Sequence, residues 1–508
     1  LHQMTQLEKN QDKFRNGKSL ITLIKFSVGP LFSECSEMLY TITDCIYLGK
    51  KSQIGLAALS ASEPLENICP TVGWWIQAGL SSHIARLFAQ SKTYQIKVVA
   101  NYSILIAFLV TMLVAMISLL TLQQILPFMG IKGNIAVEAT KYLTPLFYAS
   151  PMITLFYVFG GISFGLGYVK MFTILSVLPV ILGVAVVSPI TILWLDMGVY
   201  GAAIAAIISY VVPVVIYLVY FIFFEKMIKF FSFDAQHLQG PREAKTSLKN
   251  LLKVLHIGLP EMAGALSWIL SIAVGYKFLS IIATNINLYE EITAIWGIIS
   301  RIMSLIFSFT CGFNIGTLAT ASFSQGDNDR SRFWAFIRGD FVLCCGLAGI
   351  FELLGLSIPG LLLQLFGLPM KVLDLGTQLL RIALSCALLQ PISYCTTILF
   401  QSIDMPNFSL LITIVCALIV PGMYILVYFA TQGCENQIQI YIASSPFTDV
   451  IVSALCCILW LATRKRTEKQ WVVSGDNEDG SENEMLVGDK SVELIDNAEI
   501  DLETVQSK

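Results

Sequence analysis

Charged residues are scarce in this sequence of 508 residues. Only 13% of the residues are Asp, Glu, Lys or Arg, whereas 55% are hydrophobic, and the mean hydropathy is +0.71. An ordinary globular domain carries about 25% charged residues. The formal net charge of −3 also lacks the positive excess that is typical of nucleic-acid-binding proteins. The composition therefore excludes an ordinary soluble domain and predicts a membrane protein that does not bind nucleic acid.

Motifs for catalysis and for cofactor binding are also missing. The sequence contains no Gly-x4-Gly-Lys-Ser/Thr phosphate loop, which argues against an ATP-driven pump. The twelve cysteines lack paired zinc-type spacing, so we interpret them as free buried thiols. The histidines are scattered without metal-ligand spacing, at His2, His83, His237 and His256. We therefore expect no enzyme, no cofactor and no metal site.

Long apolar stretches are what the sequence has in abundance. A transmembrane helix needs about 20 predominantly apolar residues. Twelve stretches are long enough, at residues 18–48, 54–86, 98–127, 140–165, 170–195, 199–225, 252–282, 289–322, 334–364, 373–402, 407–430 and 438–463. The predicted fold class is an all-α polytopic membrane protein with twelve transmembrane helices.

Lys and Arg residues indicate the orientation, because short cytoplasmic connections are enriched in them. If the polar segment 1–17 is cytoplasmic, most basic residues of the connections fall on its side, including those of the loop 226–251. We therefore expect both termini to be cytoplasmic and the protein to lie in the plasma membrane.

The first apolar stretch is too long for a cleavable signal peptide. The acidic segment 464–508 lacks periodicity and is predicted to be a disordered cytoplasmic tail.

The two halves of the sequence resemble each other. At an offset of about 235 residues Phe88 superimposes on Phe323, and glutamines and prolines recur in the same order. The repeat divides the apolar part into an N-lobe, residues 18–225, and a C-lobe, residues 252–463. Six spans return the chain to its starting side, so the lobes should be parallel repeats related by a pseudo-twofold axis along the membrane normal. Such an arrangement predicts a substrate site between the lobes.

Three carboxylates lie on the first apolar stretch. Glu37 and Asp44 are seven residues apart and share one helix face, and Glu34 lies about a turn away. One charge at a bilayer centre costs about 3 kcal/mol, so such a stripe should face protein or water and bind protons or cations. We therefore predict Asp44, Glu37 and Glu34 as ion-coupling residues. Glu63 and Glu66 lie on the second stretch, where Glu63 should face these acids, and hydrogen bonding between helices is an equal alternative for Glu34 and Glu66.

The second half is expected to be organised differently, because it is poorer in acids and holds cations instead. Glu261 lies near the start of the seventh stretch, and Arg301 lies within the eighth. Arg301 either pairs with an acid to hold two helices together or contacts substrate. Trp268 is either an interfacial anchor or part of an aromatic wall for flat cations. With Glu63, Glu66 and Gln390, these residues are the predicted substrate or lobe-interface candidates.

Several motifs are similar to those of one transporter family. They are Pro30 with Asp44-Cys-Ile-Tyr-Leu-Gly49, the segments 78–86 and 197–205, and Gly258-Leu-Pro260. Together they resemble the multidrug and toxic compound extrusion family, whose members have twelve spans in two six-helix lobes. The resemblance implies export of amphipathic, often cationic organic compounds, driven by proton or sodium entry as the lobes rock. It also implies that Asp44 is the coupling carboxylate of the N-lobe.

The sequence departs from this family's pattern at other ion-site positions. Where one branch has polar residues on the fifth span, this chain has Val184 and Ser188. The eukaryotic exporters have a glutamate on the seventh span, and the corresponding residue of this chain is Trp268. Bacterial members have an aspartate on the tenth span, and the corresponding position of this chain is near Gln390. These departures shift the expected ion coupling to the N-lobe acids.

The sequence therefore predicts a secondary active antiporter that exports amphipathic, cationic organic compounds in exchange for protons, or less favourably sodium. A lipid-linked oligosaccharide flippase of the same superfamily is one alternative. A non-transporting membrane scaffold or receptor is an alternative of another class. The expected partners are a small-molecule substrate, the coupling ion and the lipid bilayer, and the protein is expected to be a monomer.

Overall fold

The described part of the chain is helical. The structure, a computed structural model, describes residues 6–49, 52–128, 131, 133–224, 241–365 and 373–473. Within these ranges every regular element is a helix and none is a strand. Ten helical segments in them are long and apolar enough to cross a membrane. The all-α, polytopic fold class predicted from the sequence is thereby confirmed.

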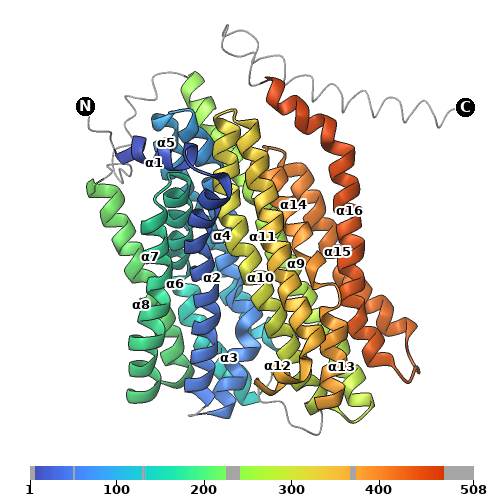
Figure 1. Ribbon diagram of the computed structural model, residues 1–508. Coiled ribbons are helices and arrows are strands. Elements are labelled where there is room, and N and C mark those ends of the chain that lie inside the picture. The colour runs from blue at the N-terminus through green and yellow to red at the C-terminus, as the bar shows by residue number, and fades with distance from the viewer. Residues whose placement is uncertain are drawn as a thin grey trace, which may run out of the picture. The chain divides into compact units, whose positions relative to one another are not determined.

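The first half of the chain begins with a short polar helix and continues with long apolar ones (Figure 1). Its elements are α1 (Gln6–Arg15), α2 (Ser19–Gly49), α3 (Gln53–Glu66), α4 (Ile68–Ala89), α5 (Thr93–Phe128), α6 (Gly133–Gly165), α7 (Val169–Val180), π-helical segments at Ile181–Val187 and Pro189–Trp194, α8 (Gly198–Val219) and a π-helical turn at Tyr220–Phe224.

The second half repeats the pattern of long helices. Its elements are α9 (Pro241–Asn285), α10 (Tyr289–Gly326), α11 (Arg330–Ser357), α12 (Pro359–Leu365), α13 (Leu373–Leu384), a 3₁₀ turn at Ala387–Leu389, α14 (Gln390–Ser402), α15 (Pro406–Ala430) and α16 (Gln437–Val473). The ten candidate spans coincide with the third to twelfth predicted stretches. Helix α2 and the pair α3–α4 occupy the first two.

Turn residues reveal the internal repeat directly. Positive φ angles recur in three pairs 237 positions apart: Ser91 and Asn328, Gly167 and Asp404, and Asp196 and Gly433. Positive φ is uncommon for residues other than glycine, so this ordered recurrence reflects a shared backbone path. It confirms the predicted repeat and changes its offset from about 235 to 237.

Helix α7 changes its winding at prolines. Pro179 and Pro189 lack the N–H groups that an α-helix would use, and π-helical segments occupy 181–187 and 189–194. The carbonyl oxygen of Val184, within the first of these segments, accepts a hydrogen bond from the hydroxyl of Tyr47 on α2 at 3.3 Å. The irregular winding therefore joins α7 to α2.

The tenth span is also broken, between α13 and α14. The 3₁₀ turn at 387–389 separates the two helices just before Pro391. A carboxylate from the neighbouring helix α11 stabilises the break, because Oε2 of Glu352 accepts a hydrogen bond from the backbone N–H of Leu388 at 2.9 Å. Glu352 thus has a structural partner inside the second half.

Hydrophobic packing shows where the halves meet. One core contains residues of the first half together with Val254, Ala319 and Phe323 of the second. The other core is built from the second half alone, by residues of α9, α10, α11, α13, α15 and α16 together with neighbouring turns. Phe323 stacks on Phe14 of α1, so the shared core reaches the end of the bundle at which α1 lies, here called the α1 end (Figure 1). In the described residues, the core that the halves share therefore includes the α1 end.

The last part of the chain forms a separate unit from Leu461 to Lys508. Its described residues continue α16 to Val473, and Arg464 Nε lies 3.7 Å from Glu468 Oε1 one turn later. The rest of the predicted acidic tail and most of the loop 226–251 lie outside the described residues. The lobe and tail boundaries stay predictions.

We predict that Glu352→Ala lowers the free energy of unfolding by about 1 kcal/mol, because the N–H of Leu388 loses its acceptor. Glu352→Gln should retain most of the stability, since its amide oxygen can still accept. Thermal unfolding of the purified protein in detergent, followed by circular dichroism, measures both variants. Equal losses in the two variants would contradict a role for this hydrogen bond.

Candidate functional site

Two helix pairs join the halves by close backbone contact. Helix α4 packs against α9, and helix α10 packs against α2. In the first pair, a Cβ atom at Gly79 would collide with the carbonyl oxygen of Val254. A Cβ atom at Gly258 would likewise collide with the carbonyl oxygen of Trp75. Only glycine allows the two backbones to approach this closely.

The second pair repeats the construction of the first. A Cβ atom at Gly312 would overlap Leu31 of α2, and one at Gly316 would overlap Ser27. Gly316 is 237 positions from Gly79, the offset at which the turns repeat. The α4–α9 and α10–α2 contacts are therefore equivalent under the internal repeat.

Short polar contacts supplement these interfaces. The indole Nε1–H of Trp75 donates a hydrogen bond to the carbonyl oxygen of Leu255 on α9 at 2.6 Å. The buried hydroxyl oxygens of Ser82 on α4 and Ser322 on α10 are 2.9 Å apart. Both contacts hold α4 to helices of the second half.

A buried ion pair closes the α1 end of the α4–α9 interface. Arg86 on α4 is 5% exposed, and its Nη1 lies 3.0 Å from Oδ1 of Asp404 in the α14–α15 turn. Its Nη2 donates to the carbonyl oxygens of Gln401 and Ser402. Lys253 on α9 pairs with the same carboxylate. Asp404 thus neutralises cations from both halves.

The charge state of Asp404 follows from these neighbours. Burial by itself would raise the pKa of its carboxyl group, but the positive charges of Arg86 and Lys253 outweigh burial and lower it. The carboxylate therefore stays ionised at neutral pH. An ionised Asp404 keeps the buried Arg86 paired.

Helix α1 lies across both halves at this end. The ring of Phe14 is fully buried and stacks on Phe323 of α10, with centroids 4.4 Å apart and an interplanar angle of 7°. The same ring contacts Phe26 of α2 at 4.5 Å and Phe88 of α4 at 6.4 Å. One aromatic side chain therefore bridges helices of the first and second halves.

Polar contacts fix α1 in the same way. Gln11 Nε2 donates to the carbonyl oxygen of Phe88 at 2.7 Å. On the other side, Arg15 Nη2 lies 2.6 Å from Oδ1 of Asp327, and Arg332 Nε donates to the carbonyl oxygen of Phe14 at 2.7 Å. Helix α1 is thus bonded to both halves.

The acids predicted for ion coupling lie at different depths of burial. Asp44 is 3% exposed, whereas Glu34 and Glu66 are half-buried. The side chains of Glu37 and Glu63 lie outside the described residues. Asp44 is therefore the most deeply buried of the described acids of α2 and α3, and its role in coupling stays a prediction.

Glu66 borders a small cavity inside the first half. The cavity has a volume of about 50 Å³, and its lining includes Asn67, Ser150, Tyr157 and Tyr210. That volume holds a few water molecules at most. Its polar lining makes it a place for water or a small cation rather than for an organic substrate.

The second half contains more buried acid than the sequence analysis expected. Asp340 on α11 is 1% exposed, Glu261 on α9 is half-buried, and Asp449 on α16 is half-buried. The amide Nε2 of Gln401 lies 3.5 Å from Oε1 of Glu261. The expectation of a second half poor in acids is therefore wrong. Isolated acids within apolar stretches were the signal that marked α2, and the same signal was present for Asp340 and Asp449.

The remaining predicted residues of the second half are spread out. Trp268 on α9 is half-buried and Arg301 on α10 is exposed. Gln390 is the first residue of α14, and in the described chain its buried Oε1 has no hydrogen-bond partner. Among the described residues, no hydrogen bond or ion pair brings these three side chains together. Their grouping as one substrate site stays a prediction.

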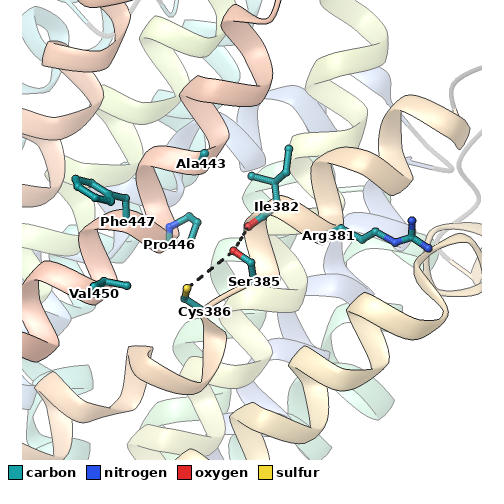
Figure 2. A pocket seen from close by; sticks show the side chains of 8 residues that line it. All are labelled: Arg381, Ile382, Ser385, Cys386, Ala443, Pro446, Phe447 and Val450. Carbon is teal, nitrogen blue, oxygen red and sulfur yellow. Dashed lines mark hydrogen bonds between the residues drawn. The ribbon is translucent and has the colours of Figure 1, made fainter.

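An open pocket lies elsewhere, between α13 and α16. Figure 2 shows its lining, which is apolar except for a few side chains. It has a volume of about 440 Å³, and its one charged lining residue is Arg381. The hydroxyl group of Ser385 donates a hydrogen bond to the carbonyl oxygen of Ile382 at 2.8 Å, so its proton is already used within the helix (Figure 2). A pocket with a positive charge and no acid is unsuited to the predicted organic cation.

The fold and the repeated interfaces define an integral multi-pass membrane protein built of two related halves. The sequence profile of the MatE family matches residues 31–189 and 269–425. The chain therefore belongs to the MatE family, as the sequence motifs predicted.

Known proteins resemble the chain over most of its length. The probable multidrug resistance protein YoeA of Bacillus subtilis (strain 168) is 23% identical over 333 residues, which cover 65% of this chain and 69% of that protein. The multidrug export protein MepA of Staphylococcus aureus (strain bovine RF122 / ET3-1) is 20% identical over 382 residues, 75% of this chain and 81% of MepA. A solved MOP superfamily transporter from Pyrococcus furiosus Vc1 superimposes with a TM-score of 0.77 at 20% identity, covering 91% of this chain and 98% of that one. The last comparison shows that the fold is shared.

We predict that Asp404→Asn lowers the free energy of unfolding by about 3 kcal/mol, because Arg86 is left buried without its countercharge. The matched control is Asp327→Asn, which removes the partner of the more exposed Arg15 and should cost less than about 1 kcal/mol. Chemical unfolding of the purified protein in detergent measures both variants. Similar losses in the two variants would contradict the assignment of Arg86–Asp404 as the stronger interface pair.

Proposed function

We propose that this protein is a secondary active transporter that exports amphipathic organic compounds in exchange for protons, or less favourably Na⁺. The observation that carries the proposal is the pair of equivalent glycine interfaces, α4–α9 and α10–α2, which in the described residues join two repeated halves that α1 bridges at one end. Repeated halves that meet at one end are suited to rocking, because the same contacts can open as a unit. The names of the relatives YoeA and MepA, which refer to multidrug resistance and export, support a drug as substrate.

The α1 end is the proposed cytoplasmic side. Basic residues collect there on α1, on the α4–α5 and α6–α7 connections and at the start of α11, for example Arg15, Lys92, Lys170 and Arg332. Such enrichment is typical of cytoplasmic connections. The structure then corresponds to a state closed toward the cytoplasm, with both termini inside and the protein in the plasma membrane.

Asp44 is the proposed coupling carboxylate. It is 3% exposed in a helix that also carries Glu34 and Glu37. A buried acid in a membrane helix is stable when it holds a proton or a cation, so it exchanges one when the lobes open to the other side. Glu37 and Glu34 are proposed to assist it.

Substrate is proposed to contact residues that face the space between the halves. Glu261 and Trp268 on α9 are half-buried and seven positions apart, so they lie on the same side of that helix. An acid and an indole together favour a flat organic cation through charge and cation–π attraction. Glu66, Glu63, Gln390 and Arg301 are further candidates.

We predict that Gly79→Val abolishes gradient-driven uptake of a fluorescent organic cation into proteoliposomes, because the valine side chain keeps α4 from closing on α9. The matched control is Gly346→Val on α11, where an added Cβ meets no atom within 4 Å. Labelling of a cysteine placed by Ser322→Cys, after the twelve native cysteines are replaced by alanine, reports the interface itself and should become faster in Gly79→Val. Unchanged labelling and transport in Gly79→Val would contradict rocking about this interface.

We predict that Asp44→Asn abolishes uptake driven by a proton gradient while the protein remains folded, because the amide cannot exchange a proton. Glu138→Gln is the matched control, since Glu138 is a surface acid that pairs with Lys141 at 2.7 Å. Transport is measured in proteoliposomes under imposed proton and sodium gradients, and folding by thermal unfolding. Transport by Asp44→Asn at the rate of the control would remove Asp44 from the mechanism.

A further inference from the structure

A buried cluster in the second half has the composition of a metal site. Asp340 and Cys344 lie one turn apart on α11, and Cys395 approaches them from α14. Their carboxylate oxygen and two sulfur atoms all lie within 4.8 Å of one another. The three residues are only 1%, 2% and 0% exposed. The cluster is therefore unlike a group of surface acids, because it is closed to bulk solvent.

The spacing of the cluster agrees with a tetrahedral metal ion. Cys344 Sγ lies 3.6 Å from Asp340 Oδ1, and Cys395 Sγ lies 3.7 Å from Oδ1 of Asn314 on α10. With Zn–S and Zn–O bonds of about 2.3 and 2.1 Å, a sulfur and an oxygen of one tetrahedral site are about 3.6 Å apart. The side chains already stand at ligand-to-ligand distances, and Asn314 supplies a fourth donor atom.

A second observation points to a missing ligand. In the described residues, Oδ2 of Asp340 is buried and has no hydrogen-bond partner. Buried polar atoms nearly always have one, so this oxygen needs an explanation. A cation held between the thiolates and the carboxylate supplies it.

We propose that Asp340, Cys344, Cys395 and Asn314 bind a divalent metal ion of the zinc class. Two thiolates favour a borderline-soft ion over Mg²⁺ or Ca²⁺, which prefer oxygen ligands throughout. Binding displaces the thiol protons, and a carboxyl proton where one is present, to solvent. With four protein ligands the site has no open position, so the ion is structural and ties α10, α11 and α14 together.

The ligands come from three helices, which is why cysteine spacing in the sequence did not predict the site. Cysteine pairs of zinc-binding motifs lie close together in one segment. Here Cys344 and Cys395 are far apart in the sequence and meet only because α11 packs against α14. The proposal revises the expectation that all cysteines are free thiols without a metal.

The test uses full-length protein, purified in detergent under reducing conditions, with exposed Cys434 and Cys457 replaced by serine to lower non-specific binding. Co²⁺ is the probe, because thiolate ligation gives charge-transfer absorption and tetrahedral geometry gives intense visible bands. We expect one Co²⁺ per chain, displaced by Zn²⁺. Cys344→Ser, Cys395→Ser and Asp340→Asn should each lower the affinity by about tenfold or more, as loss of a ligand implies.

The matched control is Cys345→Ser, which removes the thiol next to Cys344 in the chain but outside the cluster. It should bind Co²⁺ as the parent does. Absence of the bands in the parent, or equal binding by the parent and Cys344→Ser, would overturn the proposal. If Cys395→Ser fails to fold, Asn314→Ala and Asp340→Asn decide the outcome. Because the readout is metal binding, either result leaves the transport proposal untouched.

Discussion

Direct contact between the backbones of opposite halves is the constraint on which the arrangement of the helices depends. In a bilayer the hydrophobic effect does not drive one apolar helix onto another, so association depends on close packing and on small residues. Gly79 and Gly258 provide this for α4 and α9, and Gly312 and Gly316 for α10 and α2. At Gly79 and Gly258 no side chain separates the backbones of α4 and α9, so this contact cannot be loosened gradually. Such an interface is either formed or broken, which is the property that a two-state transporter needs.

Charges reinforce this interface where water can reach its edge. Arg86 emerges from α4 at the α1 end, and Asp404 meets it from a turn of the second half. The Arg86 side chain is 5% exposed and lies 3.0 Å from the carboxylate of Asp404. The Asp404 side chain is 22% exposed, so it can regain water if the halves part as proposed. An ion pair near the bilayer centre would lack that compensation. Its place at the end of the helices therefore suits it to break and re-form in the proposed rocking of the halves.

The helices and the internal repeat could be predicted from the sequence, because both depend on residue type along the chain. Apolar length marked the spans, and the similarity of residues 88 and 323 indicated the repeat within two positions of its structural offset. Contacts between distant residues, such as Arg86 with Asp404, could not be predicted from the sequence, because the two residues are 318 positions apart. A helix that is apolar all round gives no periodic signal for the face that meets a neighbour. For the same reason Asp340 and Cys395 were not recognised as neighbours, whereas Asp44 was singled out because other acids share its helix.

Phe14 has a consequence for the energy of opening. Its fully buried ring lies between Phe88 of the first half and Phe323 of the second, so the halves cannot part at this end unless the ring leaves one of them. Exposing a buried aromatic side chain to water costs about 2–3 kcal/mol. A single ring of that kind shifts the balance between the two states by roughly 30- to 150-fold. In the proposed rocking mechanism, α1, a helix of ten residues, therefore favours the state in which this end is closed.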